Sequence, residues 1–185
     1  MINRIRADLK ESHVDGKLIV AFIPIAFFTY LFHEFGHWTL GELSGNDMIL
    51  SLNNSSPRSG YFNGDLPALL SAIGGPLFTV LQGLVFLWLT GLTRSIYAYS
   101  LTFCAVFTRF FSILFGGIDR QDEARIAFMM DINKYLVAAF VLAILALILW
   151  RAMRLMKLEL KALGYFVILG VYSVLIVIGI NTYLD

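Results

Sequence analysis

Two histidines and a glutamate form the pattern in this chain that is best suited to chemistry. Residues 33–37 read His-Glu-Phe-Gly-His, so His33 and His37 are four positions apart and Glu34 follows the first of them. Residues four apart lie on one face of a helix, which lets both imidazoles bind a single metal ion. Glu34 projects about 100° round the helix from His33, where it can serve as general base towards a metal-activated water. The pattern predicts a Zn²⁺ site with His33 and His37 as ligands and Glu34 as the catalytic base.

A third ligand must come from elsewhere in the chain, because a catalytic zinc site normally has three protein ligands and one open position. The densest acidic cluster contains Asp119, Asp122 and Glu123 and follows a glycine pair that lets the chain bend back towards the bilayer. A carboxylate from this cluster is the natural candidate. The other interpretation is a solvated helix start, with acidic residues in the first turn and Arg125 as their partner.

The elements that must position these residues are membrane-spanning helices. Hydrophobic residues make up 58% of the 185 residues and charged residues only 15%, and the apolar stretches are too long for the helices of a soluble domain. We therefore predict an all-α, polytopic membrane protein with about five transmembrane helices. The predicted spans are residues 18–43, 66–90, 95–116, 134–150 and 163–183.

The histidine pattern falls inside the first predicted span. A strongly polar side chain near the bilayer centre costs about 2.5–3.5 kcal/mol on insertion, so three such residues within five positions need compensation. A bound cation beside a water-filled cavity would offset this cost. Hydrogen bonding to a neighbouring helix is the simpler alternative.

The connection between the first two spans, residues 44–65, is rich in Ser, Asn, Gly and Pro. Turn signals at Ser56-Pro57 and Asn63-Gly64 predict a short hairpin or re-entrant loop. If it lies beside the site, its free edge could hold an unwound substrate segment through main-chain hydrogen bonds. A plain connecting loop explains the composition equally well.

We divide the chain into three parts. Residues 1–17 form a basic amphipathic segment that lies on an anionic membrane surface, residues 18–130 form the core with the site, and residues 131–185 add two transmembrane helices.

Positive charge predicts the orientation. Placing the N-terminus in the cytoplasm puts most of the Lys and Arg residues on the inner side, as the positive-inside rule requires. Inside lie Arg4, Arg6, Lys10, Lys17, Arg94, Arg151, Arg154, Lys157 and Lys161, and outside lie Arg58, Arg120, Arg125 and Lys134.

Arg109 lies within the third span. A structural ion pair or snorkelling explains it, and a role in steadying an oxyanion is the alternative. A net charge of +1 without a basic block argues against a nucleic-acid partner.

The order of these features resembles the site-2 protease family of intramembrane zinc metalloproteases. His-Glu-Phe-Gly-His stands in the first span, Gly74-Gly75-Pro76-Leu77 in the second, and an acidic residue follows the third. The resemblance covers residues 18–130. It implies hydrolysis of peptide bonds in membrane-embedded protein substrates, with Zn²⁺ as the cofactor and the lipid bilayer as the surroundings. Close helix packing would explain the Gly-Pro-Leu element by itself.

The resemblance also implies Asp122 as the third ligand. In the family this ligand is an Asp near the end of the third core helix and is usually followed by Gly, whereas Glu123 stands at that place here. Asp119 remains the competing assignment. The Asn and Pro that the family commonly carries upstream are absent between Phe103 and Ile118, which resembles the compact, divergent branch of the family.

Two other classes of function stay open. One is a catalytically silent relative that acts as a chaperone or regulator of membrane helices; the missing Asn and Pro favour it and the intact Glu34 counts against it. The other is a metal transporter or sensor. A transporter should carry more polar residues along a path than the spans offer besides Arg109 and Gln82.

Overall fold

Five helices of the described chain are long and apolar enough to cross a membrane, which confirms the prediction of an all-α, multi-pass membrane protein. The computed structural model describes residues 8–9 and 11–184. The spanning helices are α2 (Gly16–Leu43), α3 (Asp65–Thr93), α4 (Ile96–Gly116), α6 (Lys134–Met156) and α7 (Leu160–Leu184). Residues 1–7 and 10 of the predicted basic segment, residues 1–17, lie outside the described residues.

The fourth spanning helix is longer than its predicted range of 134–150. It continues to Met156 and ends where Lys157 adopts a left-handed conformation with φ of 56°. Arg151 and Arg154 mark the end of the apolar run in the sequence. Long basic side chains can reach water from the end of a spanning helix, so they do not stop it.

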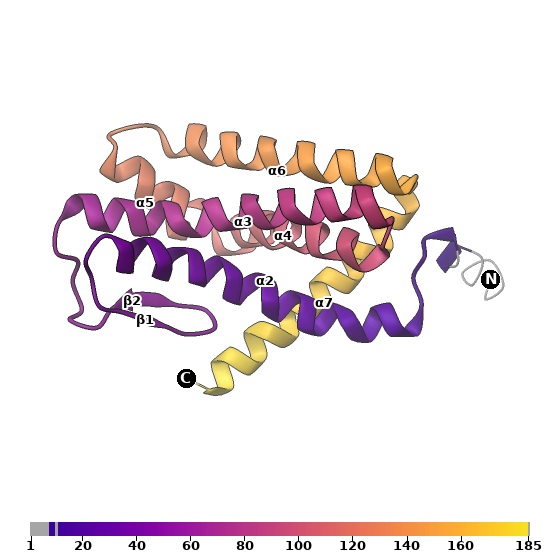
Figure 1. Cartoon of the computed structure of the whole chain (residues 1–185), viewed down its shortest axis with the longest axis horizontal. Helices are drawn as coiled ribbons and strands as arrows, with labels where there is room; N and C mark the ends of the chain where they lie inside the picture. The colour runs from indigo at the N-terminus through magenta and orange to yellow at the C-terminus, as the bar shows by residue number, and fades with distance from the viewer. Residues whose placement is uncertain (1–7, 10, 185) are drawn as a thin grey trace.

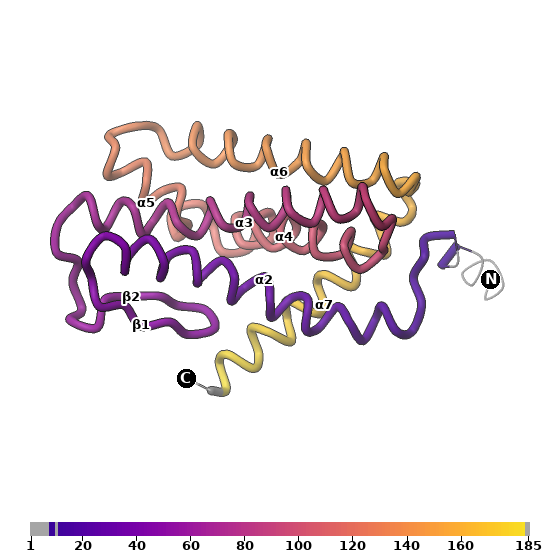
Figure 2. The backbone as a smooth tube through the Cα atoms, viewed as in Figure 1, coloured from indigo at the N-terminus to yellow at the C-terminus, as the bar shows by residue number. Residues whose placement is uncertain are grey.

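Helix α3 lies at the centre of the bundle and packs against α2, α4, α6 and the short helix α5 (Asp122–Met129). Helix α7 runs obliquely across the others and contacts α2 and α4 (Figures 1 and 2). A buried aromatic cluster joins α2, α4 and α7 through Phe22, Tyr99, Phe103 and Phe166.

Helices α2 and α3 touch through their backbones at the level of the histidine pattern. A Cβ atom added to Gly36 would overlap the carbonyl group of Gly74, and one added to Gly74 would overlap the carbonyl of Gly36. Small residues allow this approach between helices in lipid. The contact brings the face of α3 that contains Gly75 directly against the two histidines.

The connection between α2 and α3 is an antiparallel hairpin, as predicted. Strands β1 (Met48–Leu50) and β2 (Ser55–Pro57) pair with Met48 opposite Pro57. The hairpin reverses at residues 51–54, where the Ser51 N–H donates to the Asn54 carbonyl at 2.9 Å. The turn predicted at Ser56-Pro57 begins at Pro57, after the second strand, where the Gly60 N–H donates to the Pro57 carbonyl at 2.9 Å. Pro57 fits at the end of a short strand because it has no N–H to offer a ladder.

The hairpin is fixed to the end of α2. The Trp38 indole N–H donates to the Met48 carbonyl at 3.2 Å, and the Met48 N–H donates to Glu42 Oε1 at 2.8 Å. Figure 1 shows the hairpin alongside the last turns of α2. The two histidines lie in the last third of α2, so the hairpin is at the end of the bundle that is nearer to them.

Candidate metal centre

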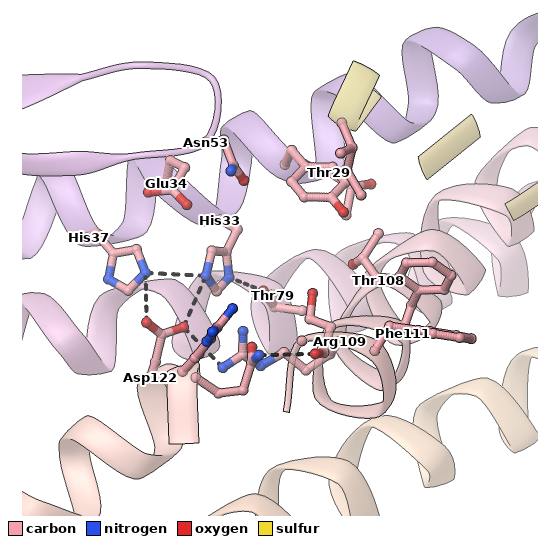
Figure 3. Close-up of a pocket in the computed structure, with 17 residues that line it drawn as sticks. Thr29, His33, Glu34, His37, Asn53, Thr79, Thr108, Arg109, Phe111 and Asp122 are labelled. Atoms are coloured by element: carbon pink, nitrogen blue, oxygen red, sulfur yellow. Dashed lines mark hydrogen bonds and ion pairs between the residues drawn. The ribbon is translucent and has the colours of Figure 1, made fainter. Parts of the chain in front are cut away.

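His33, His37 and Asp122 converge between α2 and the first turn of α5 (Figure 3). The two histidine Nε2 atoms are 3.2 Å apart. Asp122 Oδ2 lies 3.2 Å from His33 Nε2, and Oδ1 lies 3.4 Å from His37 Nε2. One ligand atom from each residue falls within 4.8 Å of the other two, which is the arrangement that a small metal ion requires.

The two candidate aspartates lie in different surroundings. Asp119 lies in a 3-10 turn (Ile118–Arg120), where it is 76% exposed and forms an ion pair with Lys134. Asp122 begins α5 four residues after this turn starts and points at the histidines (Figure 3). Of the two, only Asp122 is in position to act as a ligand, and its role as one stays a prediction.

The interpretation of the acidic cluster as a solvated helix start is wrong for Glu123. Asp122 and Glu123 do occupy the first turn of α5, but Glu123 is 0% exposed. Arg125, the expected partner of these acids, lies over the ring of Phe62 at 5.2 Å instead.

Hydrogen bonds on the outer side of each ring indicate which nitrogen carries the proton. His37 Nδ1 lies 2.7 Å from the Ser71 carbonyl oxygen, which can only accept, so Nδ1 must donate. His33 Nδ1 lies 2.8 Å from Thr79 Oγ1, whose own hydrogen is directed to the Gly75 carbonyl at 3.1 Å. When a ring is neutral with its proton on Nδ1, its Nε2 carries the lone pair, which is the tautomer that binds metal.

The Asp122 carboxylate faces these two Nε2 atoms. Burial alone would raise the pKa of the Asp122 carboxyl, but hydrogen bonds from the two histidines and the charge of Arg109 outweigh it and hold that pKa well below its ordinary value. Three electron-rich atoms at such distances need positive charge among them, which protons on Nε2 or a metal ion can supply. The donor set thus fits Zn²⁺, which prefers nitrogen and carboxylate oxygen in a three-residue site with an open position.

Gly75 forms a cradle for the two rings. A Cβ atom at this position would lie 2.5 Å from His37 Cε1 and 2.7 Å from His33 Cε1. The glycine pair of α3 therefore has two separate uses: Gly74 admits the backbone of α2, and Gly75 leaves room for the imidazoles.

Glu34 lines the same cavity, which has a volume of about 460 Å³. Figure 3 shows Glu34 on the hairpin side of the two rings, with Asp122 on the opposite side. The cavity reaches Asn53 in the hairpin turn, Phe111 on α4 and Ile178 on α7. Glu34 and an open cavity thus lie next to the three candidate ligands.

The predicted structural ion pair of Arg109 is confirmed, and it adjoins the centre. Arg109 is 6% exposed; its Nε donates to Glu123 Oε1 at 2.8 Å, and its Nη2 pairs with Glu123 Oε2. The same Nη2 lies 3.0 Å from Asp122 Oδ2.

Sequence reasoning missed the groups that orient the rings, Ser71 and Thr79. Both are polar residues in an apolar span, and with Gly75 they recur every four positions, which places them on one face of α3. This stripe of small and polar residues could have predicted which face of the helix contacts the histidines. Asn53 was also missed, because its place depends on where the hairpin turns.

Comparisons with protein-family models, curated proteins and solved structures give no match to this chain.

Proposed function

We propose that this chain is an intramembrane zinc metalloprotease of the site-2 protease type, which hydrolyses peptide bonds in membrane-embedded protein substrates. One observation carries the proposal. Two imidazole nitrogens in the metal-binding tautomer and one carboxylate converge within 4.8 Å, inside a bundle of membrane-crossing helices.

The residues of the site would divide the work as follows. His33, His37 and Asp122 would hold the ion, which when bound supplies a Lewis acid that makes water acidic near neutral pH and polarises the scissile carbonyl. A carboxylate oxygen of Glu34 accepts a proton from the attacking water. It then returns this proton to the amide nitrogen as the carbon–nitrogen bond breaks. Glu34 is suited to this exchange because it lines the cavity without belonging to the converging ligand set.

The substrate must unwind before it can react, because a helix keeps its carbonyl groups in internal hydrogen bonds. The hairpin offers a place for the unwound segment. Its turn reaches the cavity at Asn53, so a peptide near Glu34 would lie close to the hairpin, whose strands could bind it through main-chain groups. Helix-breaking residues near the cleavage position would favour cutting.

The orientation that we propose keeps the N-terminus in the cytoplasm. The start of α2, the α3–α4 connection, and the α6–α7 connection with the helix ends beside it carry six of the eleven described Lys and Arg residues, including Lys17, Arg94 and Lys157. His33 is ten residues from the end of α2 and seventeen from its start. At 1.5 Å per residue these separations are about 15 and 26 Å, so the centre would lie nearer the outer surface.

Replacement of Glu34 by Gln tests the proposal, because it removes the base and keeps the shape of the side chain. We would compare the new protein N-termini in membranes of cells that express the parent chain or Glu34→Gln. Glu159→Gln, which lies outside the cavity in the α6–α7 connection, is the control.

Termini inside spanning segments of other membrane proteins should appear with the parent and the control only. The same termini with Glu34→Gln, or an unchanged cellular phenotype for that variant, would contradict proteolysis. Either result would favour a silent protein that binds membrane helices as a chaperone or regulator.

A further inference from the structure

Arg109 and Glu123 form a fully enclosed ion pair between α4 and α5. The guanidinium engages Glu123 through both Nε and Nη2, and Glu123 has no exposed surface. Removing two charges from water is costly, and well-packed apolar residues often serve stability as well or better. The need to hold two helices together therefore does not by itself account for this pair.

The pair has a third member. Arg109 Nη2 lies 3.0 Å from Oδ2 of Asp122, so one guanidinium contacts two consecutive carboxylates of the first turn of α5. The fork of an arginine has a fixed planar geometry, which sets both the start of α5 relative to α4 and the direction of the Asp122 side chain. With Arg109 on one side of it, Oδ2 faces His33 Nε2 at 3.2 Å, and Oδ1 faces His37 Nε2 at 3.4 Å.

The charge of a metal ion would explain why Arg109 is paired with Glu123. A lone arginine beside the centre would repel a cation. With Glu123 fully paired to it, Arg109 donates a charge-assisted hydrogen bond to Asp122 while the pair as a whole adds no net charge to the site. Without Arg109, the half-buried carboxylate of Asp122 and the buried carboxylate of Glu123 would repel each other.

We propose that Arg109, held by Glu123, is a positioning residue that aims the Asp122 carboxylate at the metal ion, an inference that rests on the zinc site proposed above. Arg109 acts through Asp122, so its loss changes the affinity and geometry of the site rather than its ligand set. Groups that hold metal ligands in this way are worth about 10–100-fold in metal affinity.

The test is the double variant Arg109→Gln/Glu123→Gln, in which two amides can still bond and no unpaired charge is buried. Zn²⁺ affinity would be measured by chelator competition on the detergent-purified full chain. The absorption spectrum of bound Co²⁺ would report the geometry of the site. The matched control is Asp119→Asn/Lys134→Gln, which removes an ion pair at the same end of the bundle but away from the cavity.

We expect the double variant to bind Zn²⁺ about 10–100-fold more weakly and to show an altered Co²⁺ spectrum, while the control matches the parent. If the amide pair fails to fold, Arg109→Met/Glu123→Leu replaces the ion pair by apolar side chains and should show the same weakening. Folded variants with the affinity and spectrum of the parent would overturn the inference and leave the zinc site intact. A parent chain that binds no Zn²⁺ would instead refute the proposed function.

Discussion

The cradle at Gly75 allows the metal centre to be perturbed without changing any ligand. In Gly75→Ala the new methyl carbon would lie 2.5 Å from His37 Cε1 and 2.7 Å from His33 Cε1, whereas ordinary contact begins near 3.4 Å. The methyl carbon would overlap His37 Nε2 more closely still, so the rings must retreat by at least about 0.9 Å, well beyond the roughly 0.2 Å by which metal–ligand distances vary.

This displacement should cost more than the loss of an outer hydrogen bond to a ligand, which is worth about 10–100-fold in metal affinity. We expect Gly75→Ala to weaken Zn²⁺ binding by at least about 100-fold, which corresponds to about 2.8 kcal/mol. The assay is Zn²⁺ competition with a chelator of known affinity, on detergent-purified protein whose thermal unfolding is followed in parallel.

The matched control is Gly91→Ala on the same helix. Its Cβ atom would meet Leu155 at 3.7 Å, an ordinary contact, and the change gives the same gain in helix propensity of about 1 kcal/mol. The control should bind Zn²⁺ like the parent. Parent-like affinity in Gly75→Ala would refute the placement of the two rings against α3.

Two further substitutions test the surroundings of the centre. Thr79→Val removes the oxygen that orients one imidazole and should weaken Zn²⁺ binding about 10–100-fold in the same competition assay. Thr90→Val, whose hydroxyl only bonds its own helix, should not, and equal affinities in the two variants would count against the assigned tautomer. Glu123→Ala removes the two-point partner of the buried Arg109, leaves it only the contact with Asp122, and should destabilise the fold by about 3 kcal/mol, seen as a lower thermal unfolding midpoint. Asp119→Ala, which breaks the exposed pair with Lys134, should leave the unfolding midpoint nearly unchanged. Equal midpoints in Glu123→Ala and Asp119→Ala would show that the buried pair stabilises the fold no more than the exposed one.

The sequence predicted the features that depend on periodicity and on run length. Five apolar stretches became five long helices, because a span is determined by its own composition. The four-residue spacing of His33 and His37 was sufficient to place both rings on one face of α2. These inferences need no knowledge of distant contacts.

Features that depend on the path of a connection were harder to predict. Asp119 and Asp122 are three positions apart, and only the 3-10 turn between α4 and α5 decides which of them faces α2. The hairpin was expected, but its turn lies at residues 51–54, where no Gly or Pro marks it. The burial of Glu123 was not visible at all, since its partner Arg109 is fourteen positions away on another helix.

The most direct test of the central claim is the zinc content of the purified chain, compared with that of His37→Ala, Asp122→Ala and Asp119→Ala. We predict about one Zn²⁺ per chain in the parent and in Asp119→Ala, and loss of the metal in His37→Ala and Asp122→Ala. Retention of zinc in Asp122→Ala, or no zinc in the parent even after it is supplied, would contradict a metal centre built from His33, His37 and Asp122.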